Sequence, residues 1–353
     1  MRRRNFVSAV GSVAGAAALI PGCSGQRNAA AGKRALMKLG CQNGTSDEAL
    51  QFKLRMGVQA VRAEVPIGSP ADVFKKERER IERTGITLDQ LSMGTDRTGK
   101  CPIMLGKSPE RDREIEKIQE YIRNCAAAGI PGISYYLTLL GILRTERELG
   151  RGGNSYTAWH LADGQKQAFT APKESVSADT VWERLDYFLE RVIPVAAEYK
   201  IRMAHHPHDP SVPPGFRGVN QVLGTVDGLK KYIAMRENPY HGLNFCQGTV
   251  CEMLVNPGKE IFDVIRYFGT RKKIFNVHFR NIRGGLNNFR ETMPDEGDVD
   301  FFEAMKVYKE VEYAYMIMPD HVPSHPDDPG SRQAMAFAYG HVRALIQAVD
   351  RLG

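Results

Sequence analysis

Residues 112–139 read DREIEKIQEYIRNCAAAGIPGISYYLTL and contain one complete step from a helix to a strand. Apolar side chains recur every three or four positions between Ile115 and Cys125, among charged residues, and Gly129 ends this pattern. The apolar run 132–139 has the length and composition of a buried strand. An amphipathic helix followed by a buried strand is the repeating unit of α/β folds.

The same alternation continues along the chain from residue 35 to the end. Short apolar runs predict strands at 35–40, 58–64, 87–93, 132–139, 202–206, 243–247, 274–280 and 313–319. Longer amphipathic stretches predict helices at 46–56, 70–84, 110–128, 178–199, 226–236, 258–268, 299–311 and 333–352.

These strand–helix units predict an α/β fold, a (β/α)8 TIM barrel that forms one domain over residues 35–353. The long segments 141–173 and 207–222 follow the fourth and fifth strands, at the C-terminal face where barrels carry their active sites. An open doubly wound sheet is the weaker alternative, because no G-x-G-x-x-G follows an early strand.

Composition excludes several classes of protein. The chain has 353 residues, of which 42% are hydrophobic and 25% are charged, so it is neither disordered nor collagen-like. The formal charge is +7, and Arg2, Arg3 and Arg4 supply part of it. No dense basic stripe interleaved with aromatic residues follows, so we expect no nucleic-acid partner.

The first 23 residues, MRRRNFVSAVGSVAGAAALIPGC, have the basic start and short apolar run of an export signal. Arg3-Arg4 resembles the twin-arginine signal, and 19–23 resembles a lipobox whose Cys23 becomes a lipid anchor. Residues 24–34 are expected to form a flexible tether. These features predict a bacterial protein that is exported, either to the periplasm or as a membrane-anchored lipoprotein. The alternative is a cytoplasmic protein with an apolar first helix.

The last four predicted strands each end at a residue that can bind a metal: His206, Cys246, His278 and Asp320. They lie roughly 30 to 40 residues apart, the length of one strand–helix unit, so a barrel brings them to one point at its mouth. Two imidazoles, a thiolate and a carboxylate suit Zn(II), Fe(II), Co(II) or Mn(II) rather than Ca²⁺ or Mg²⁺. Taken singly, each residue could equally be a buried structural group.

Around these residues the sequence resembles the mannonate dehydratase family of xylose-isomerase-like TIM barrels. The segments that carry the resemblance are HPHDP (206–210), GLNFCQG (242–248), VHFRN (277–281), GDVD (297–300) and PDH (319–321). The resemblance implies that His206, Cys246, His278 and Asp320 bind the metal, with Mn(II) favoured. It further implies elimination of water from an aldonic acid to give a 2-keto-3-deoxy acid, in a homo-oligomer.

The chemistry also needs groups that move protons and hold the substrate. His321 is the predicted acid or base, and its alternative role is to orient Asp320. Arg280 is predicted to contact substrate or take part in catalysis, or else to form a salt bridge at the barrel mouth. Arg144 and His208 are weaker predictions for substrate binding.

The sequence departs from the family pattern at several positions. His208 replaces an Asp, and Met318 replaces an Arg that usually precedes the PDH segment. The Gly-Tyr pair that supplies the family's catalytic Tyr is absent, and Tyr339 is the predicted substitute. These changes leave two alternatives open: a metal-dependent sugar isomerase, epimerase or glycoside lyase that acts through an enediolate, and a non-catalytic carbohydrate-binding barrel of the cell envelope.

Overall fold

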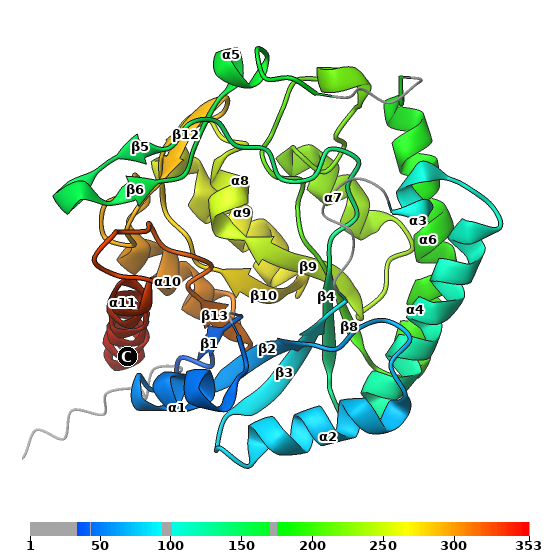
Figure 1. The fold of residues 1–353 in the computed structure, drawn as a ribbon, viewed down its shortest axis with the longest axis horizontal. Helices are drawn as coiled ribbons and strands as arrows, with labels where there is room; N and C mark the ends of the chain where they lie inside the picture. Colours follow the sequence, from blue (N-terminus) through cyan, green and yellow to red (C-terminus); the bar gives the residue numbers. More distant parts are fainter. Residues whose placement is uncertain (1–33, 43, 94–100, 170–174, 353) are drawn as a thin grey trace, which may run out of the picture. The chain divides into compact units, whose positions relative to one another are not determined.

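The structure is a computed structural model that describes residues 34–42, 44–93, 101–169 and 175–352. Eight parallel strands close into a barrel in the order β1, β13, β10, β9, β8, β4, β3, β2 (Figure 1). Their bounds are β1 (Lys38–Cys41), β2 (Ala60–Glu64), β3 (Thr87–Ser92), β4 (Gly132–Tyr135), β8 (Arg202–His205), β9 (His241–Cys246), β10 (Ile274–His278) and β13 (Met316–Met318). Each strand falls within or overlaps a predicted run, and the predicted TIM barrel is confirmed.

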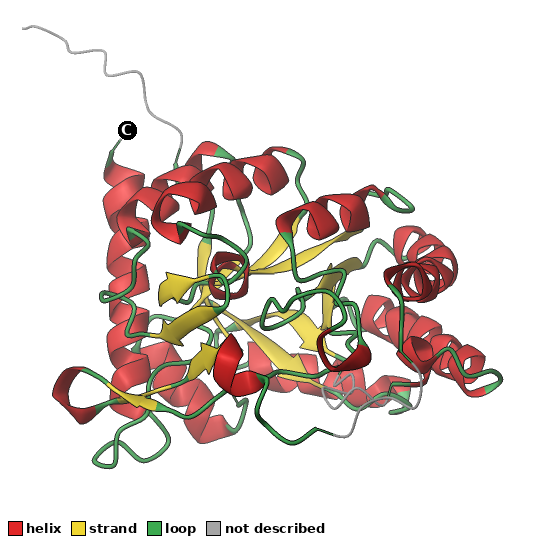
Figure 2. Ribbon diagram, turned by 90° about the horizontal axis from the view of Figure 1, so that it is seen from above, coloured by secondary structure: helices red, strands yellow, loops and turns green. Residues whose placement is uncertain are grey.

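In the part of the chain that the structure describes, eight long helices follow these strands and surround the barrel (Figure 2). They are α1 (Asp47–Arg55), α2 (Ala71–Glu82), α4 (Glu110–Ala127), α6 (Ala178–Glu198), α7 (Val226–Ala234), α9 (Pro257–Thr270), α10 (Phe301–Glu310) and α11 (Arg332–Arg351). Side-chain caps fix where several of them begin. Ser46, Ser177 and Thr225 each accept a hydrogen bond from a backbone N–H in the first turn of the helix that follows.

Two apolar layers hold the barrel together. Outside the strands, the inner faces of the helices are buried, as with Ile115, Ile118 and Ile122 of α4. Inside the barrel, Ala60, Met316 and Met318 form a small separate apolar cluster. Above this cluster the interior becomes polar toward the C-terminal ends of the strands, which gives the barrel mouth its chemistry.

The connections at the C-terminal face contain elements that the sequence pattern did not predict. These are α3 (Pro102–Leu105), β5 (Glu148–Leu149), β6 (Ser155–Tyr156), β7 (Ala158–His160), α5 (Leu161–Gly164), α8 (Gln247–Cys251), β11 (Ile282–Gly285) and β12 (Asn288–Glu291). Strands β11, β12 and β7 pair into a small antiparallel sheet, which ties the loop after β4 to the loop after β10. This sheet places Glu291 beside the barrel mouth.

The predicted export signal (1–23), its Cys23 and the predicted tether up to residue 33 lie outside the described residues. Among the helices that the structure describes, none has the length and apolar character needed to cross a membrane. Five cysteines fall in the described part of the chain, and all five side chains are buried.

Candidate metal centre and active site

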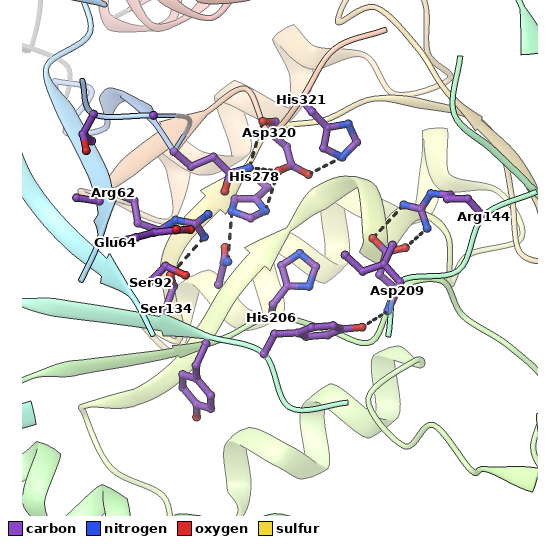
Figure 3. A pocket seen from close by; sticks show the side chains of 18 residues that line it. Arg62, Glu64, Ser92, Ser134, Arg144, His206, Asp209, His278, Asp320 and His321 are labelled. Carbon is purple, nitrogen blue, oxygen red and sulfur yellow. Dashed lines mark hydrogen bonds and ion pairs between the residues drawn. The ribbon is translucent and has the colours of Figure 1, made fainter. Parts of the chain in front are cut away.

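A cavity of about 830 Å³ opens at the C-terminal ends of the barrel strands (Figure 3). Polar side chains dominate its lining. Arg62, Glu64, Ser92 and Ser134 lie together on one side, and Arg144 and Asp209 lie on the other. His206, His278, Asp320 and His321 lie between these two groups. The cavity is therefore a polar chamber large enough for a small, highly hydroxylated molecule.

His206, Cys246 and His278 converge beside this cavity. One nitrogen from each imidazole and the Cys246 sulfur all lie within 4.8 Å of one another. The topology causes this convergence, because β8, β9 and β10 are neighbours and Cys246 is the register partner of His278. Three of the four residues predicted as metal ligands thus form one cluster.

Asp320, the fourth predicted ligand, lies next to this cluster, two residues beyond β13. Its Oδ1 is 3.4 Å from His278 Nδ1, and its Oδ2 is 3.9 Å from the Cys246 sulfur. Burial raises the pKa of Asp320, but the nearby His278, His321 and Arg280 outweigh this effect and hold the pKa well below its usual range. Asp320 is therefore an anion, as a metal ligand must be.

The two histidines are oriented so that each presents a ring nitrogen to the cluster. His206 Nδ1 lies 2.7 Å from the carbonyl of Pro207, a contact that assigns the proton to Nδ1 and leaves Nε2 as an electron-pair donor. His278 Nδ1 is buried and has no hydrogen-bond partner among the described residues. Burial lowers the pKa of both imidazoles, so both are neutral and able to bind a metal.

Behind His278, two buried amides form a chain. Asn244 Nδ2 is 3.3 Å from His278 Nε2, and Asn276 Nδ2 donates to Asn244 Oδ1 over 2.9 Å. A metal-ligating histidine usually donates its other N–H to an acceptor. Turning both amides by 180° supplies that acceptor: Asn244 Oδ1 then faces Nε2, and Asn244 Nδ2 donates to Asn276 Oδ1, which has no partner as the amides stand. The donor set and its surroundings therefore fit a transition-metal dication.

His321 follows Asp320 and lies at the edge of the cavity, with 46% of its side chain exposed. Its Nδ1 is 2.9 Å from Glu291 Oε2, and its Nε2 is 3.3 Å from Asp320 Oδ2. Although desolvation opposes protonation, the Glu291 and Asp320 carboxylates raise the pKa of His321 to about 9. The ring is therefore an imidazolium at neutral pH, which suits a proton donor.

Arg280, which the sequence predicted to contact substrate or take part in catalysis, does not line the cavity. It is 3% exposed, and its guanidinium lies 2.9 Å from Glu252, 3.0 Å from Glu291 and 3.4 Å from Asp320. A Cβ at Gly248 would lie 2.7 Å from the guanidinium carbon, so the glycine makes room for it. The other role predicted for Arg280, a salt bridge at the barrel mouth, matches this geometry.

Arg144 does line the cavity, where it forms an ion pair with Asp209. Both terminal nitrogens of Arg144 contact the Asp209 carboxylate, and Nη2 also lies 2.7 Å from Glu291. Asp209 in turn accepts a hydrogen bond from the Thr249 hydroxyl. Arg144 thus joins the loop after β4 to the loop after β8 and lies in position to contact a ligand.

Two predicted site residues lie elsewhere. His208 is buried between backbone groups, with Nε2 3.0 Å from the Leu137 carbonyl and Nδ1 accepting from Leu223 N–H. Both of its ring nitrogens are used, and His208 does not line the cavity. The Tyr339 hydroxyl lies 2.6 Å from the Cys41 sulfur, and the ring packs in the core under α11. Tyr339 does not line the cavity, so the structure gives no geometric basis for the catalytic role predicted for it.

Sequence reasoning missed the cavity residues supplied by the first four strands. Gln42 follows β1, Arg62 and Glu64 lie on β2, Ser92 ends β3, and Ser134 lies on β4. The rule that located the metal ligands, polar residues at consecutive strand ends, applies equally to these positions. Glu291 was missed for another reason, because its place depends on the β11–β12 hairpin. The GGLNN segment at 284–288 is the turn signal that could have revealed this hairpin.

A family model and several curated relatives that resemble this chain all name the same family. The family model for D-mannonate dehydratase (UxuA) matches residues 158–352, more than half of the chain. A mannonate dehydratase of Thermotoga petrophila is 30% identical over 337 residues, covering 84% of this chain and 91% of its own. A mannonate dehydratase of Endomicrobium trichonymphae is 38% identical over 159 residues, covering 44% of this chain and 42% of its own.

Solved structures show the same fold. The mannonate dehydratase from Streptococcus suis serotype 2 superposes with a TM-score of 0.77 at 22% identity, covering 90% of this chain and 95% of its own. A xylose isomerase domain protein from Planctomyces limnophilus gives a TM-score of 0.59 at 12% identity, covering 90% and 99%. The chain belongs to the mannonate dehydratase family, whose members are hydro-lyases that depend on a divalent metal.

Proposed function

We propose that this protein is a metal-dependent dehydratase that removes water from an aldonic acid, with D-mannonate as the first substrate to test. The observation that carries this proposal is the cluster of His206, Cys246 and His278, with Asp320 beside it, at the edge of a polar cavity. The reaction breaks the C2–H and C3–OH bonds and releases water. The enol that remains tautomerises to a 2-keto-3-deoxy acid.

His206, Cys246, His278 and Asp320 would hold the metal, for which we favour Mn(II) over Zn(II), Fe(II) and Co(II). When bound, the dication withdraws electron density from the substrate carboxylate and 2-hydroxyl, which acidifies the C2 proton. Cys246 must lose its proton to bind the metal. Burial and the Asp320 and Asp209 charges raise the pKa of this thiol, and the Arg280 charge and the Thr249 hydroxyl offset only part of that rise, so the bound dication would have to displace the proton.

His321 is the group that we propose protonates the departing 3-hydroxyl. It is held as an imidazolium by Glu291 and Asp320, and it lies at the cavity wall beside the metal ligands. Arg280 stays within its buried ion pairs, where it balances the charges of Asp320 and Glu291. Arg144 holds Asp209 in an ion pair at the side of the cavity opposite Arg62.

The test is turnover of a panel of aldonic acids by the full chain purified without chelator and supplied with Mn²⁺. We expect D-mannonate or one of its epimers to give a 2-keto-3-deoxy acid, identified by NMR in D₂O. The Cys246→Ala variant should lose bound metal and turnover together. The control, Cys251→Ala, changes another buried thiol that is not part of the cluster and should keep both.

A protein that binds one metal per chain but converts no aldonic acid would overturn the dehydratase proposal. Conversion of a neutral sugar by such a protein would favour the isomerase or epimerase alternative. If sugar acids bound without conversion, the carbohydrate-binding alternative would be favoured. Metal preference is tested in the same preparation by comparing turnover after Mn²⁺, Zn²⁺, Fe²⁺ or Co²⁺ has been added.

We further propose that residues 1–23 direct export and that Cys23 becomes a lipid anchor, on the sequence pattern of this segment. Replacing Arg3 and Arg4 with Lys should retain the protein in the cytoplasm if the twin-arginine pathway is used. Cys23→Ser should move it from the membrane to the soluble fraction if the anchor forms. A homo-oligomer, the state implied by the family resemblance, is tested by light scattering of the purified chain.

A further inference from the structure

We propose that Glu64 is the base that removes the C2 proton of the acidic sugar in the cavity. The elimination needs such a group, because one proton leaves C2 while another must reach the departing 3-hydroxyl. His321 can supply the second proton. The catalytic Tyr of the family pattern is absent, and Tyr339 lies in the core, so another side chain must act with His321. This assignment rests on the proposed function, and it adds the residue that starts the reaction.

Glu64 is the last residue of β2, and the alternation of side chains along this strand brings it to the cavity. Val61 and Val65 pack in the main apolar core. Glu64 faces the other way, as Arg62 does, and lines the cavity. Its register partner is Ser92, which ends β3 and also lines the cavity. The Glu64 side chain is exposed there, so its carboxylate can reach a ligand.

Three carboxylates line the cavity among the described residues, and two of them already have other partners. Asp320 lies beside the metal cluster. Asp209 contacts two nitrogens of Arg144 and accepts a hydrogen bond from the Thr249 hydroxyl. The Glu64 carboxylate, in contrast, forms no hydrogen bond or ion pair with any described residue. Its oxygens are therefore available to accept a proton from a substrate.

The imidazoles and phenols that line the described part of the cavity are occupied as well. His206 and His278 belong to the metal cluster. Both ring nitrogens of His321 lie against carboxylates. The hydroxyls of Tyr135 and Tyr136 each form a hydrogen bond within the protein. Once the metal is bound, none of these five side chains has an electron pair free for a substrate proton, which leaves the carboxylate at the end of β2.

Glu64 and His321 lie on different sides of the proposed metal site. In the view of Figure 3, Glu64 lies on one side of His278 and Asp320, and His321 lies on the other. A sugar acid beside His278 and Asp320 would thus lie between a carboxylate and an imidazolium. The Glu64 carboxylate accepts the C2 proton, and the electron pair of the C2–H bond becomes the C2–C3 double bond. The electron pair of the C3–O bond leaves with water, which takes its second proton from His321.

The first experiment measures kcat and KM for D-mannonate with the Mn²⁺-loaded full chain. Glu64→Gln keeps the size of the side chain but removes the base, and it should lower kcat by roughly 10²- to 10⁴-fold. KM should not rise, because the variant loses a negative charge near an anionic substrate. Glu116→Gln, which changes an exposed acid on α4, is the matched control and should behave like the wild type. Metal content and thermal midpoint are recorded for every variant, so that loss of metal or misfolding is recognised directly.

Two further measurements follow the proton transfer itself. NMR in D₂O records exchange of the C2 proton of D-mannonate for deuterium. His321→Gln should still catalyse this exchange, because its defect lies at the C3–O bond, whereas Glu64→Gln should not. Formate is a small carboxylate that can enter the space left in Glu64→Ala. It should restore part of the turnover of that variant and none of the turnover of His321→Gln.

The outcomes distinguish this proposal from the proposed function. If Glu64→Gln keeps the wild-type kcat, the assignment of Glu64 is wrong and the dehydratase proposal stands. If Glu64→Gln loses turnover through a raised KM, still exchanges the C2 proton and formate has no effect on Glu64→Ala, Glu64 binds substrate and is not the base. If the wild type exchanges the C2 proton through Glu64 but releases no water, the base stands and the dehydratase proposal fails. A wild type that neither exchanges this proton nor converts an aldonic acid overturns both.

Discussion

His278 and Asp320 lie side by side at the ends of two neighbouring strands, with Nδ1 of the histidine 3.4 Å from Oδ1 of the aspartate. No hydrogen bond joins them, and among the described residues this buried nitrogen has no other hydrogen-bond partner. Leaving a buried polar atom unpaired costs stability. A dication held between these two groups would supply the interaction that His278 Nδ1 lacks.

Metal binding should therefore stabilise the fold. Because the metal binds the folded state and not a preformed site in the unfolded chain, an excess of ~100 times Kd adds about 2.7 kcal/mol. For a barrel of this size we expect chelation to lower the thermal midpoint by about 5 °C, and Mn²⁺ to restore it. Calorimetric scans of the wild type, Cys246→Ala and Cys251→Ala test this. The response should vanish only in Cys246→Ala.

Asn244 should control how tightly the metal binds without being a ligand. Its amide contacts His278 Nε2 and is itself held by Asn276. Asn244→Leu leaves the His278 ring without an acceptor and should weaken metal affinity by roughly 10- to 100-fold. Loss of the hydrogen-bond partner of a ligating histidine commonly has an effect of this size. Asn244→Asp keeps an acceptor and should bind at least as tightly as the wild type. Competition with a chelating dye measures both, and Asn220→Leu, outside the cavity, is the control.

The barrel was predictable because its apolar pattern is local. Each strand needs only a short buried run, and each helix needs only an apolar stripe. The order in which these patterns alternate along the sequence therefore predicts the fold. The metal cluster was predictable for the same reason. His206, Cys246 and His278 occupy equivalent strand ends, and the closed barrel brings equivalent ends together.

The rest of the site depends on contacts between loops that no local pattern encodes. Glu291 reaches the mouth because β12 pairs with β7, a strand from a loop more than a hundred residues earlier. His208 lies only two residues from His206, but its ring is hydrogen-bonded to two backbone groups and does not face the cavity. Tyr339 shows the limit of a motif match, because α11 turns its hydroxyl toward Cys41.

Replacing the buried acids Glu252 and Glu291 with glutamine should change the free energy of unfolding by different amounts. Burial and the Asp209 charge raise the pKa of Glu252 well above its usual range, so Glu252→Gln replaces a neutral group and should cost no more than about 1 kcal/mol. In Glu291, the nearby Arg280, His321 and Arg144 overcome the effect of burial and lower the pKa to about 2. Glu291→Gln therefore leaves buried cations uncompensated and should cost about 3–5 kcal/mol. Urea unfolding measures both, and equal losses would contradict this assignment of charge.

Acid should destabilise the fold partly through His241, which lies at the start of β9. Burial lowers the pKa of this histidine to about 4, below the value of roughly 6.5 expected in the unfolded chain. Its contribution is thus complete above pH 6.5 and is lost as the pH falls toward 4. Between pH 7 and pH 5 we expect the wild type to lose about 2 kcal/mol more than His241→Gln, by urea unfolding. His325→Gln, at a half-buried position in the loop before α11, is the control and should follow the wild type.

His321 and Tyr339 should separate in kinetic experiments, since only one of them faces the cavity. His321→Gln keeps a hydrogen bond to Glu291 but removes the proton donor, and it should lower kcat by roughly 10²- to 10⁴-fold. Tyr339→Phe loses only the contact with the Cys41 sulfur, and its kcat should stay within about twofold of the wild type. Steady-state assays at saturating Mn²⁺ measure both values. A large loss in Tyr339→Phe with unchanged stability would mean that α11 moves its tyrosine into the cavity during turnover, and His321 would then share the proton transfer with a residue that the structure places in the core.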